Sequence, residues 1–367
     1  MGLITRKPAV LVLEDGTVYK GFSLGKIGVA TGEICYNTGM TGYQEIYTDP
    51  SYFGQIIINT SSHIGNYGTV DDEQESSFPQ ISGVIINEYS EIFSRSNSNQ
   101  SLEDYFIKNN TVAIYDIDTR KLVKYIRDKG AMNCIISSES EDVNSLKQKL
   151  EKVPSMKNLE LSSKVTTKKE YEFGDKDSKI KIAVLDLGCK KSILKNFSER
   201  GALCKVFPAK TTYDKMSKWN PDGFFISNGP GDPASMDYAV NTVKEILKND
   251  IPIFGICLGH QILARACEIS TYKLHNGHRG INHPVKNLLS GKSEVTSQNH
   301  GFSVSIDDIK KSNTLELTHV NLNDDTVEGI KVKDKKAFSV QFHPESCPGP
   351  HDSRYLFDEF IQLIKND

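Results

Sequence analysis

The chain has 367 residues, of which 38% are hydrophobic and 25% are charged, and its formal net charge is −3. This composition is typical of an ordinary soluble globular protein and argues against a general binder of nucleic acid or membrane surfaces. No apolar run approaches the roughly 20 residues that a membrane-spanning helix needs.

The first 150 residues predict a mixed, strand-rich domain. Residues 10–13 and 17–19 flank an Asp-Gly pair, which predicts a β-hairpin. Asp118, followed by apolar residues at helical spacing, predicts an N-capped helix that ends near Gly130. Further buried strands are expected at residues 55–59, 83–86 and 112–115.

The composition changes between residues 141 and 179, where Lys, Glu and Ser dominate. We interpret this stretch as a helix followed by a linker at residues 151–179. The chain is long for one domain, so the expected organisation is an N-terminal domain at 1–150, this linker, and a second domain at 180–367.

From residue 180 onward, apolar strand-like runs alternate with amphipathic helical segments. Such alternation predicts an α/β domain with a doubly wound, mostly parallel sheet. In these sheets, functional sites gather at the C-terminal ends of the strands. Cys257 and the loop at residues 228–231 both follow strand-like runs, so we expect them at that edge.

Cys257 lies between Gly255 and Gly259, after an apolar run and before a helix-like segment. A sharp strand-to-helix turn presents a nucleophile in this way, and a helix N-terminus favours the thiolate. The alternative is a buried structural cysteine at the end of a strand. The other six cysteines are scattered without a CxxC pair, which favours small buried residues in a reducing cytoplasm over a disulfide framework or zinc ribbon.

His343 and Glu345 are separated by Pro344 near the end of the chain. In an extended segment they would project to the same side, so the carboxylate could orient the imidazole toward Cys257. A surface His-Pro turn is the alternative. Taken together, the motifs favour a Cys-His-Glu hydrolase or transferase.

Two loops could complete such a site. Residues 228–233 read Asn-Gly-Pro-Gly-Asp-Pro after a strand, and the amides of Gly231 and Leu258 could stabilise an oxyanion. Residues 299–302, Asn-His-Gly-Phe, could recognise a substrate amide or carboxylate. Both loops are equally compatible with ordinary turns.

The elbow around Cys257, the 228–233 loop and the His-Pro-Glu segment together resemble the class I glutamine amidotransferase domain, over residues 180–367. Several synthases share that domain. The N-terminal half is more specific, because residues 37–45 and 48–52, with His63-Ile-Gly-Asn66 and residues 116–120, resemble the family of carbamoyl phosphate synthase small subunits. Residues 277–284 are also similar to a family segment, although Arg279 and Ile281 depart from it.

The resemblance implies hydrolysis of L-glutamine to glutamate and ammonia through a thioester on Cys257, with His343 transferring protons and Glu345 orienting His343. It implies glutamine contacts at Ser51, Gly229, Gly231, Leu258, Gln261, Asn299, Gly301 and Phe302, and no metal.

The implied partner is a large subunit, in a heterodimer or a higher oligomer, which makes carbamoyl phosphate from bicarbonate and ATP for pyrimidine or arginine synthesis. No cofactor is expected on this chain. ATP and magnesium are expected on the large subunit, in line with the absence here of a G-x-x-x-x-G-K-[ST] loop.

Three alternatives remain open at this point. The chain could be a glutaminase subunit that serves another synthase. It could be a cysteine peptidase or thioesterase with the same elbow, or a regulator that has kept the fold without the activity.

Overall fold

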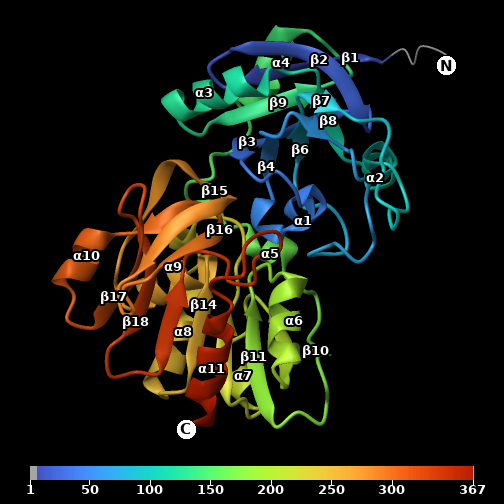
Figure 1. The fold of residues 1–367 in the computed structure, drawn as a ribbon. Coiled ribbons are helices and arrows are strands. Elements are labelled where there is room, and N and C mark those ends of the chain that lie inside the picture. The colour runs from blue at the N-terminus through green and yellow to red at the C-terminus, as the bar shows by residue number, and fades with distance from the viewer. Residues whose placement is uncertain (1–5, 367) are drawn as a thin grey trace. The chain divides into compact units, whose positions relative to one another are not determined.

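The computed structural model describes residues 6–366, and the chain divides into two compact units, Met1–Met156 and Lys157–Asp367 (Figure 1). Each unit has its own apolar cores, and each is considered by itself below.

The first unit is built on a closed seven-stranded barrel with the strand order β1-β2-β8-β6-β4-β3-β9. The predicted hairpin is confirmed, because Leu11 pairs with Tyr19 in the antiparallel β1–β2 ladder. The barrel strands are β1 (Pro8–Leu13), β2 (Val18–Gly25), β3 (Val29–Asn37), β4 (Gln55–Asn59), β6 (Gly83–Ile85), β8 (Val112–Tyr115) and β9 (Asn133–Ser137).

Short helices and a small two-stranded sheet accompany the barrel. The predicted helix is α3, where the Asp118 side chain accepts a hydrogen bond from the Lys121 amide and Gly130 forms the C-cap. The remaining elements are α1 (Tyr43–Thr48), η1 (Pro50–Tyr52), β5 (His63–Ile64), β7 (Glu88–Tyr89), α2 (Leu102–Lys108), α3 (Thr119–Lys129) and α4 (Val143–Leu150).

The second unit contains a ten-stranded sheet with the order β10-β12-β11-β13-β14-β19-β18-β17-β15-β16. The expected α/β fold is confirmed, but the parallel part is limited to the neighbouring strands β12, β11, β13, β14 and β19, and the other five join antiparallel. The strands are β10 (Tyr171–Phe173), β11 (Ile180–Asp186), β12 (Ala202–Pro208), β13 (Gly223–Ile226), β14 (Ile253–Ile256), β15 (Thr271–Asn287), β16 (Ser293–Val304), β17 (Leu315–Asn321), β18 (Val327–Val332) and β19 (Ala337–Val340).

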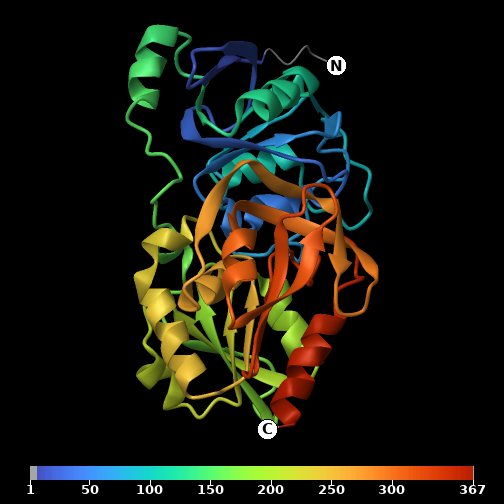
Figure 2. The ribbon, with the colours of Figure 1, turned by 90° about the vertical axis from the view of Figure 1, so that its left-hand side faces the viewer.

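Helices cover both faces of this sheet, as a doubly wound arrangement requires (Figures 1 and 2). One apolar core packs α8 and α9 against the sheet, and the other packs α6 and α11 against the opposite side chains of the same strands. The helices are α5 (Ser162–Val165), α6 (Lys191–Glu199), α7 (Tyr213–Ser217), η2 (Pro233–Ser235), α8 (Asp237–Lys248), α9 (Leu258–Ala266), α10 (Ile306–Lys311) and α11 (Tyr355–Lys365).

The segment expected as a linker at 151–179 is different in the structure. Most of it belongs to the second unit, where β10 pairs with β12 and Glu160 bridges to Gly231. The polar composition misled the prediction because β10 is a short edge strand, whose Tyr171 and Glu172 are exposed.

Among residues 6–366, no helix has the length and apolar character needed to cross a membrane.

Candidate active site

Cys257 lies between the parallel strand β14 and the helix α9, which begins at Leu258. Its backbone has φ 56° and ψ −103°, a conformation that a residue with a side chain rarely adopts. The Cys257 amide donates to Val340 O at 2.9 Å on the neighbouring strand β19, which anchors the turn to the sheet. The predicted strand-to-helix elbow is therefore present, and its strain is concentrated at the residue with the sulfur.

The two flanking glycines are required by close backbone approaches. A Cβ on Gly259 would lie 2.0 Å from Ile226 O, and a Cβ on Gly255 would lie 2.8 Å from Gly259 O. These contacts let α9 begin directly against β13 and β14. The motif therefore encodes a packing constraint around Cys257.

We expect Gly259→Ala to lower the free energy of unfolding by about 2 kcal/mol or more, because the new methyl group meets rigid backbone. Urea titration would measure the change. Gly28→Ala is the matched control, because its new methyl would meet only the Val112 side chain, at an ordinary 3.4 Å. Equal losses in the two variants would contradict this account of the elbow.

His343 follows β19 and lies near Cys257 within the second unit. Its Nδ1 forms a 2.7 Å hydrogen bond with Glu345 Oε1, and both side chains are buried. The His343 amide donates to Ser297 O at 2.8 Å, so β16 fixes the backbone that carries the imidazole. His343 Nε2 has no hydrogen-bond partner among the nitrogen and oxygen atoms of residues 6–366, so this nitrogen is left for Cys257 or a substrate.

Electrostatics favour a charged pair in this buried place. Burial lowers the pKa of His343, but the Glu345 carboxylate and the Cys257 thiol raise it to about 10. Burial raises the pKa of Glu345, but Lys190 and His343 lower it to about 2. At neutral pH the imidazole is therefore protonated and the carboxylate ionised, so the site holds an acid next to the sulfur.

Lys190 was not singled out from the sequence, yet it is a central part of this arrangement. Its ammonium group donates to Glu345 Oε1 and to Cys347 O, at 2.9 Å each, and the residue is only 3% exposed. Lys190 is the N-cap of α6, at the end of the short turn that follows β11, and its amide donates to Asn228 Oδ1 at 3.2 Å. Only the strand order β11-β13-β14-β19 brings this lysine to Glu345, so no local signal could have revealed it.

The loop at residues 228–233 follows β13 and lies next to the elbow. A Cβ on Gly229 would come within 3.1 Å of Leu258 Cδ2, and Gly231 has φ 102°. Asp232 accepts from the Asn158 amide at 2.8 Å and donates its own amide to Leu159 O at 2.9 Å. Leu258 is the first residue of α9, so its amide has no carbonyl partner within the helix and can donate to another group.

The segment 299–302 is part of β16, where the sequence had suggested a loop. Cys257 Sγ lies 3.5 Å from Asn299 O, and Gln261 Nε2 donates to Phe302 O at 2.8 Å. Gln261 Nε2 also donates to Gln341 Oε1 at 3.0 Å, so this side chain ties α9 to β16 and to the end of β19. The strand that carries Asn299, Gly301 and Phe302 therefore runs beside Cys257.

Ser51 lies in the first unit, in the short turn η1, where its amide donates to Asp49 Oδ1 at 2.9 Å. The residue is buried within the described chain. Its expected contact with glutamine stays a prediction.

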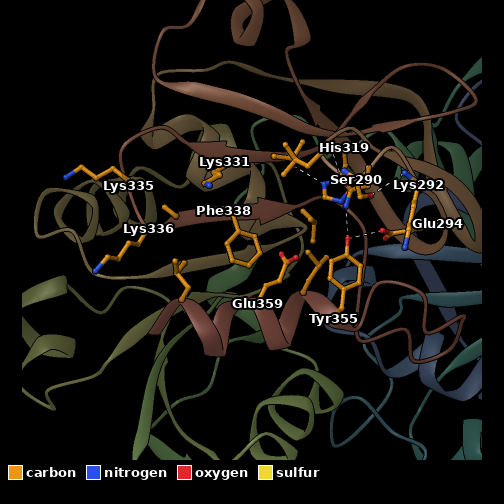
Figure 3. A pocket seen from close by; sticks show the side chains of 17 residues that line it. Ser290, Lys292, Glu294, His319, Lys331, Lys335, Lys336, Phe338, Tyr355 and Glu359 are labelled. Atoms are coloured by element: carbon orange, nitrogen blue, oxygen red, sulfur yellow. Dashed lines mark hydrogen bonds between the residues drawn. The ribbon is translucent and has the colours of Figure 1, made fainter. Parts of the chain in front are cut away.

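A cavity of about 610 Å³ lies elsewhere in the second unit, between strands β17 to β19 and helix α11 (Figure 3). Lys331, Lys335 and Lys336 lie at one side of it, and Phe338 and Glu359 lie between them and Tyr355. Neither Cys257 nor His343 lines this cavity. The candidate site is therefore assigned to the reactive groups around Cys257, because the size of a cavity does not indicate a reaction.

Comparison with known proteins agrees with the two-part organisation. Residues 183–363 match the family "Glutamine amidotransferase class-I", and residues 11–136 match "Carbamoyl-phosphate synthase small chain, CPSase domain". The chain is 48% identical to the carbamoyl phosphate synthase small chain of Chlorobaculum tepidum, with 98% of each chain covered. The chain belongs to the family of carbamoyl phosphate synthase small chains.

Two further members of this small-chain family are similar over nearly the whole length. The small chain of Vibrio vulnificus is 45% identical, with 98% of each chain covered. That of Synechococcus is 43% identical over all of this chain and 96% of its own.

Arg279, which departs from the family pattern expected from sequence, is buried. Its Nη1 donates to Asn276 O at 2.7 Å, and its guanidinium would lie 3.2 Å from a Cβ placed on Gly301. Arg279 also pairs with Asn299 in the β15–β16 ladder, so it lies beside the strand that contacts the Cys257 sulfur.

Proposed function

We propose that this chain hydrolyses L-glutamine to glutamate and ammonia, and that it delivers the ammonia to a large subunit that makes carbamoyl phosphate. The observation that carries the proposal is the strained Cys257 at the N-terminus of α9, next to a buried His343 held by Glu345. Membership of the small-chain family supports the choice of glutamine over a peptide or a thioester.

In the first half of the reaction, the Cys257 sulfur attacks the carboxamide carbon of glutamine and a carbon–sulfur bond forms. The negative charge moves to the amide oxygen, which the Gly231 and Leu258 amides would stabilise. The protonated His343 then gives its Nε2 proton to the amide nitrogen as the carbon–nitrogen bond breaks. The products of this half are ammonia and a γ-glutamyl thioester on Cys257.

In the second half, water attacks the thioester. The neutral imidazole left after ammonia departs takes a proton from this water, and the carbon–sulfur bond breaks to give glutamate. Glu345 and Lys190 keep the imidazole in one orientation through both halves, because they form a buried chain of charged hydrogen bonds. No metal or cofactor takes part in these steps.

The remaining proposed glutamine contacts are Ser51, Gly229, Gln261, Asn299, Gly301 and Phe302. We further propose that ATP and magnesium are used by the large subunit and that the product serves pyrimidine or arginine synthesis. Ammonia is nucleophilic only when neutral, so direct transfer to the partner would protect it from protonation. This gives a chemical reason for a heterodimer.

Covalent labelling tests the identity of the nucleophile. We expect a glutamine analogue with an electrophilic side chain to modify Cys257 alone, and free glutamine to protect it. Mass spectrometry of the digested chain would locate the label among the seven cysteines. Labelling of another cysteine, or labelling that glutamine does not slow, would count against the proposed site.

The partner is tested separately. Adding this chain to a carbamoyl phosphate synthase large subunit should give carbamoyl phosphate synthesis that depends on glutamine. The large subunit by itself should require added ammonia. If glutamine is hydrolysed but no carbamoyl phosphate forms, the chain serves a different synthase.

A further inference from the structure

A second cluster of polar side chains lies in the second unit, and it does not include Cys257, His343 or Glu345. His278 on β15, His300 on β16 and Glu328 on β18 bring one ligand atom each to within 4.8 Å of one another. This cluster could not be predicted from the sequence, because His278 and Glu328 are 50 positions apart and only the folded sheet brings the three residues together. Nothing in the proposed hydrolysis uses this cluster.

The carboxylate of the cluster is fully buried and only half satisfied. Asn321 Nδ2 donates to Glu328 Oε1 at 2.9 Å, but Oε2 has no hydrogen-bond partner among the described residues. The Gln298 amide group also lies within reach of the Glu328 carboxylate, and one of its two hydrogens points to Thr296 Oγ1 at 3.3 Å. An anionic oxygen buried in this way needs a cation or a donor beside it.

His278 presents one ring nitrogen to the cluster and uses the other outside it. Its Nε2 forms a 2.8 Å contact with Asp324 Oδ2, while Nδ1 lies 3.7 Å from Glu328 Oε1 without a hydrogen bond. A carboxylate that holds the far nitrogen of a histidine is the usual support of a metal-binding imidazole.

His300 is held in the same manner. Its Nδ1 lies 2.8 Å from Phe302 O, which can only accept, so Nδ1 carries the hydrogen. The neutral ring then has a lone pair at Nε2, which lies 3.0 Å from the side-chain amide of Gln298. This lone pair is the group that His300 could offer to a metal ion.

We propose that His278 Nδ1, His300 Nε2 and Glu328 Oε2 bind a divalent transition metal, with zinc as the ion of best fit. Two imidazoles and one carboxylate are a ligand set that zinc favours, and the fourth position would go to water. Ligand atoms on tetrahedral zinc lie about 3.4 Å apart, so ligand atoms that lie within 4.8 Å of one another must draw together by up to about 1.4 Å through side-chain rotation.

The place of this ion in the fold gives it a structural role. It would join β15, β16 and β18 next to Asn299, whose carbonyl contacts the Cys257 sulfur. Asp324 is 41% exposed at its side chain and His278 is 14% exposed, so the ion could enter from that side. The zinc-binding claim does not depend on glutamine hydrolysis.

Zinc binding to the purified full-length chain tests the proposal. The metal is first removed with a chelator, and the chain is then incubated with zinc and freed of excess metal. We expect one zinc per chain by elemental analysis, with an affinity measurable by competition against a chromophoric chelator. Glu328→Gln should weaken binding by about 100-fold or more, and Asp324→Asn by about 10- to 100-fold. Cobalt in place of zinc should give a spectrum without thiolate-to-metal charge transfer, because no cysteine belongs to the ligand set.

Glu294→Gln is the matched control, because Glu294 is a buried glutamate on β16 with an unpartnered Oε2 and lies outside the cluster. It should bind zinc like the parent chain. If Glu328→Gln does not fold, the partly exposed Asp324 still provides the test.

The same atoms have an alternative use. Burial lowers the pKa of His278, but Asp324 and Glu328 raise it to about 9, so a protonated His278 could bridge the two carboxylates without metal. In that case the chain binds no zinc stoichiometrically. The absence of stoichiometric zinc would overturn the proposal. It would also be overturned if the Glu328→Gln and Asp324→Asn variants bound zinc as tightly as the parent chain, or if the cobalt spectrum showed thiolate-to-metal charge transfer.

Discussion

Replacing Cys257 by alanine should lower the rate of glutamate release from glutamine by about 10⁴-fold or more. The sulfur is the atom that forms and breaks the covalent bond, and no other described group can take its place beside His343. The rate is measured as glutamate formed per chain, with and without the large subunit. Alanine keeps the Cβ of cysteine, so the backbone strain at φ 56° is unchanged and the variant should fold like the parent.

Cys267→Ala is the matched control for this loss. Cys267 is the C-cap of the same helix, α9, and burial raises the pKa of its thiol to about 11, which keeps it protonated and unreactive. Its substitution should leave glutamate release within about twofold of the parent. Comparable losses in the two variants would mean that α9, rather than the Cys257 sulfur, carries the effect.

Cys257→Gly separates the chemistry from the strain. This variant should be as inactive as Cys257→Ala but more stable by about 1 kcal/mol, because glycine adopts positive φ without a Cβ clash. Urea unfolding of the two inactive variants measures the difference. Equal stabilities would indicate that the elbow stores no strain.

Replacing Lys190 by methionine should lower the free energy of unfolding by about 3 kcal/mol at neutral pH. Methionine keeps the apolar length of the side chain but leaves Glu345 buried with one cationic partner in place of two, and leaves Cys347 O without its donor. Removing one member of a buried ion pair typically costs about 3–5 kcal/mol, and His343 retains part of that interaction here. Denaturant titration measures the change.

The loss of unfolding free energy in Lys190→Met should become smaller as the pH falls. The folded-state pKa of Glu345 is about 2, below its ordinary value of 4.5, so its stabilising effect is present above pH 4.5 and is lost as the pH falls toward 2. Without Lys190 the pKa of Glu345 rises, because the ammonium is the leading cause that lowers it. The difference between parent and variant should therefore be greatest near pH 7 and should narrow as the pH falls below 4.5.

Lys195→Met is the control for charge removal by itself. Lys195 lies on the same helix, α6, and forms only an exposed contact of 4.0 Å with Glu199. Its substitution should change stability by no more than about 0.5 kcal/mol at any of these pH values. A similar loss of stability in both variants would show that the buried hydrogen bonds among Lys190, Glu345 and His343 are not the source of the effect.

The local sequence was sufficient for the individual elements and for the reactive groups. The hairpin around Asp15, the caps of α3 and the elbow at Cys257 are encoded within a few residues, because turn geometry, capping and close backbone approach are short-range constraints. The two-residue spacing of His343 and Glu345 likewise predicted their hydrogen bond. Each of these features depends on residues that are close together in the sequence, so the sequence alone is enough to predict it.

The tertiary structure decided the rest, because it depends on which strands lie side by side. Lys190 reaches Glu345 only through the order β11-β13-β14-β19, and residues 299–302 became part of a long antiparallel strand instead of a free loop. The polar segment before β11 joined the second unit as α5 and an edge strand. The cluster of His278, His300 and Glu328 exists only because β15 to β18 fold together, and pairings over such distances leave no periodic signal in the sequence.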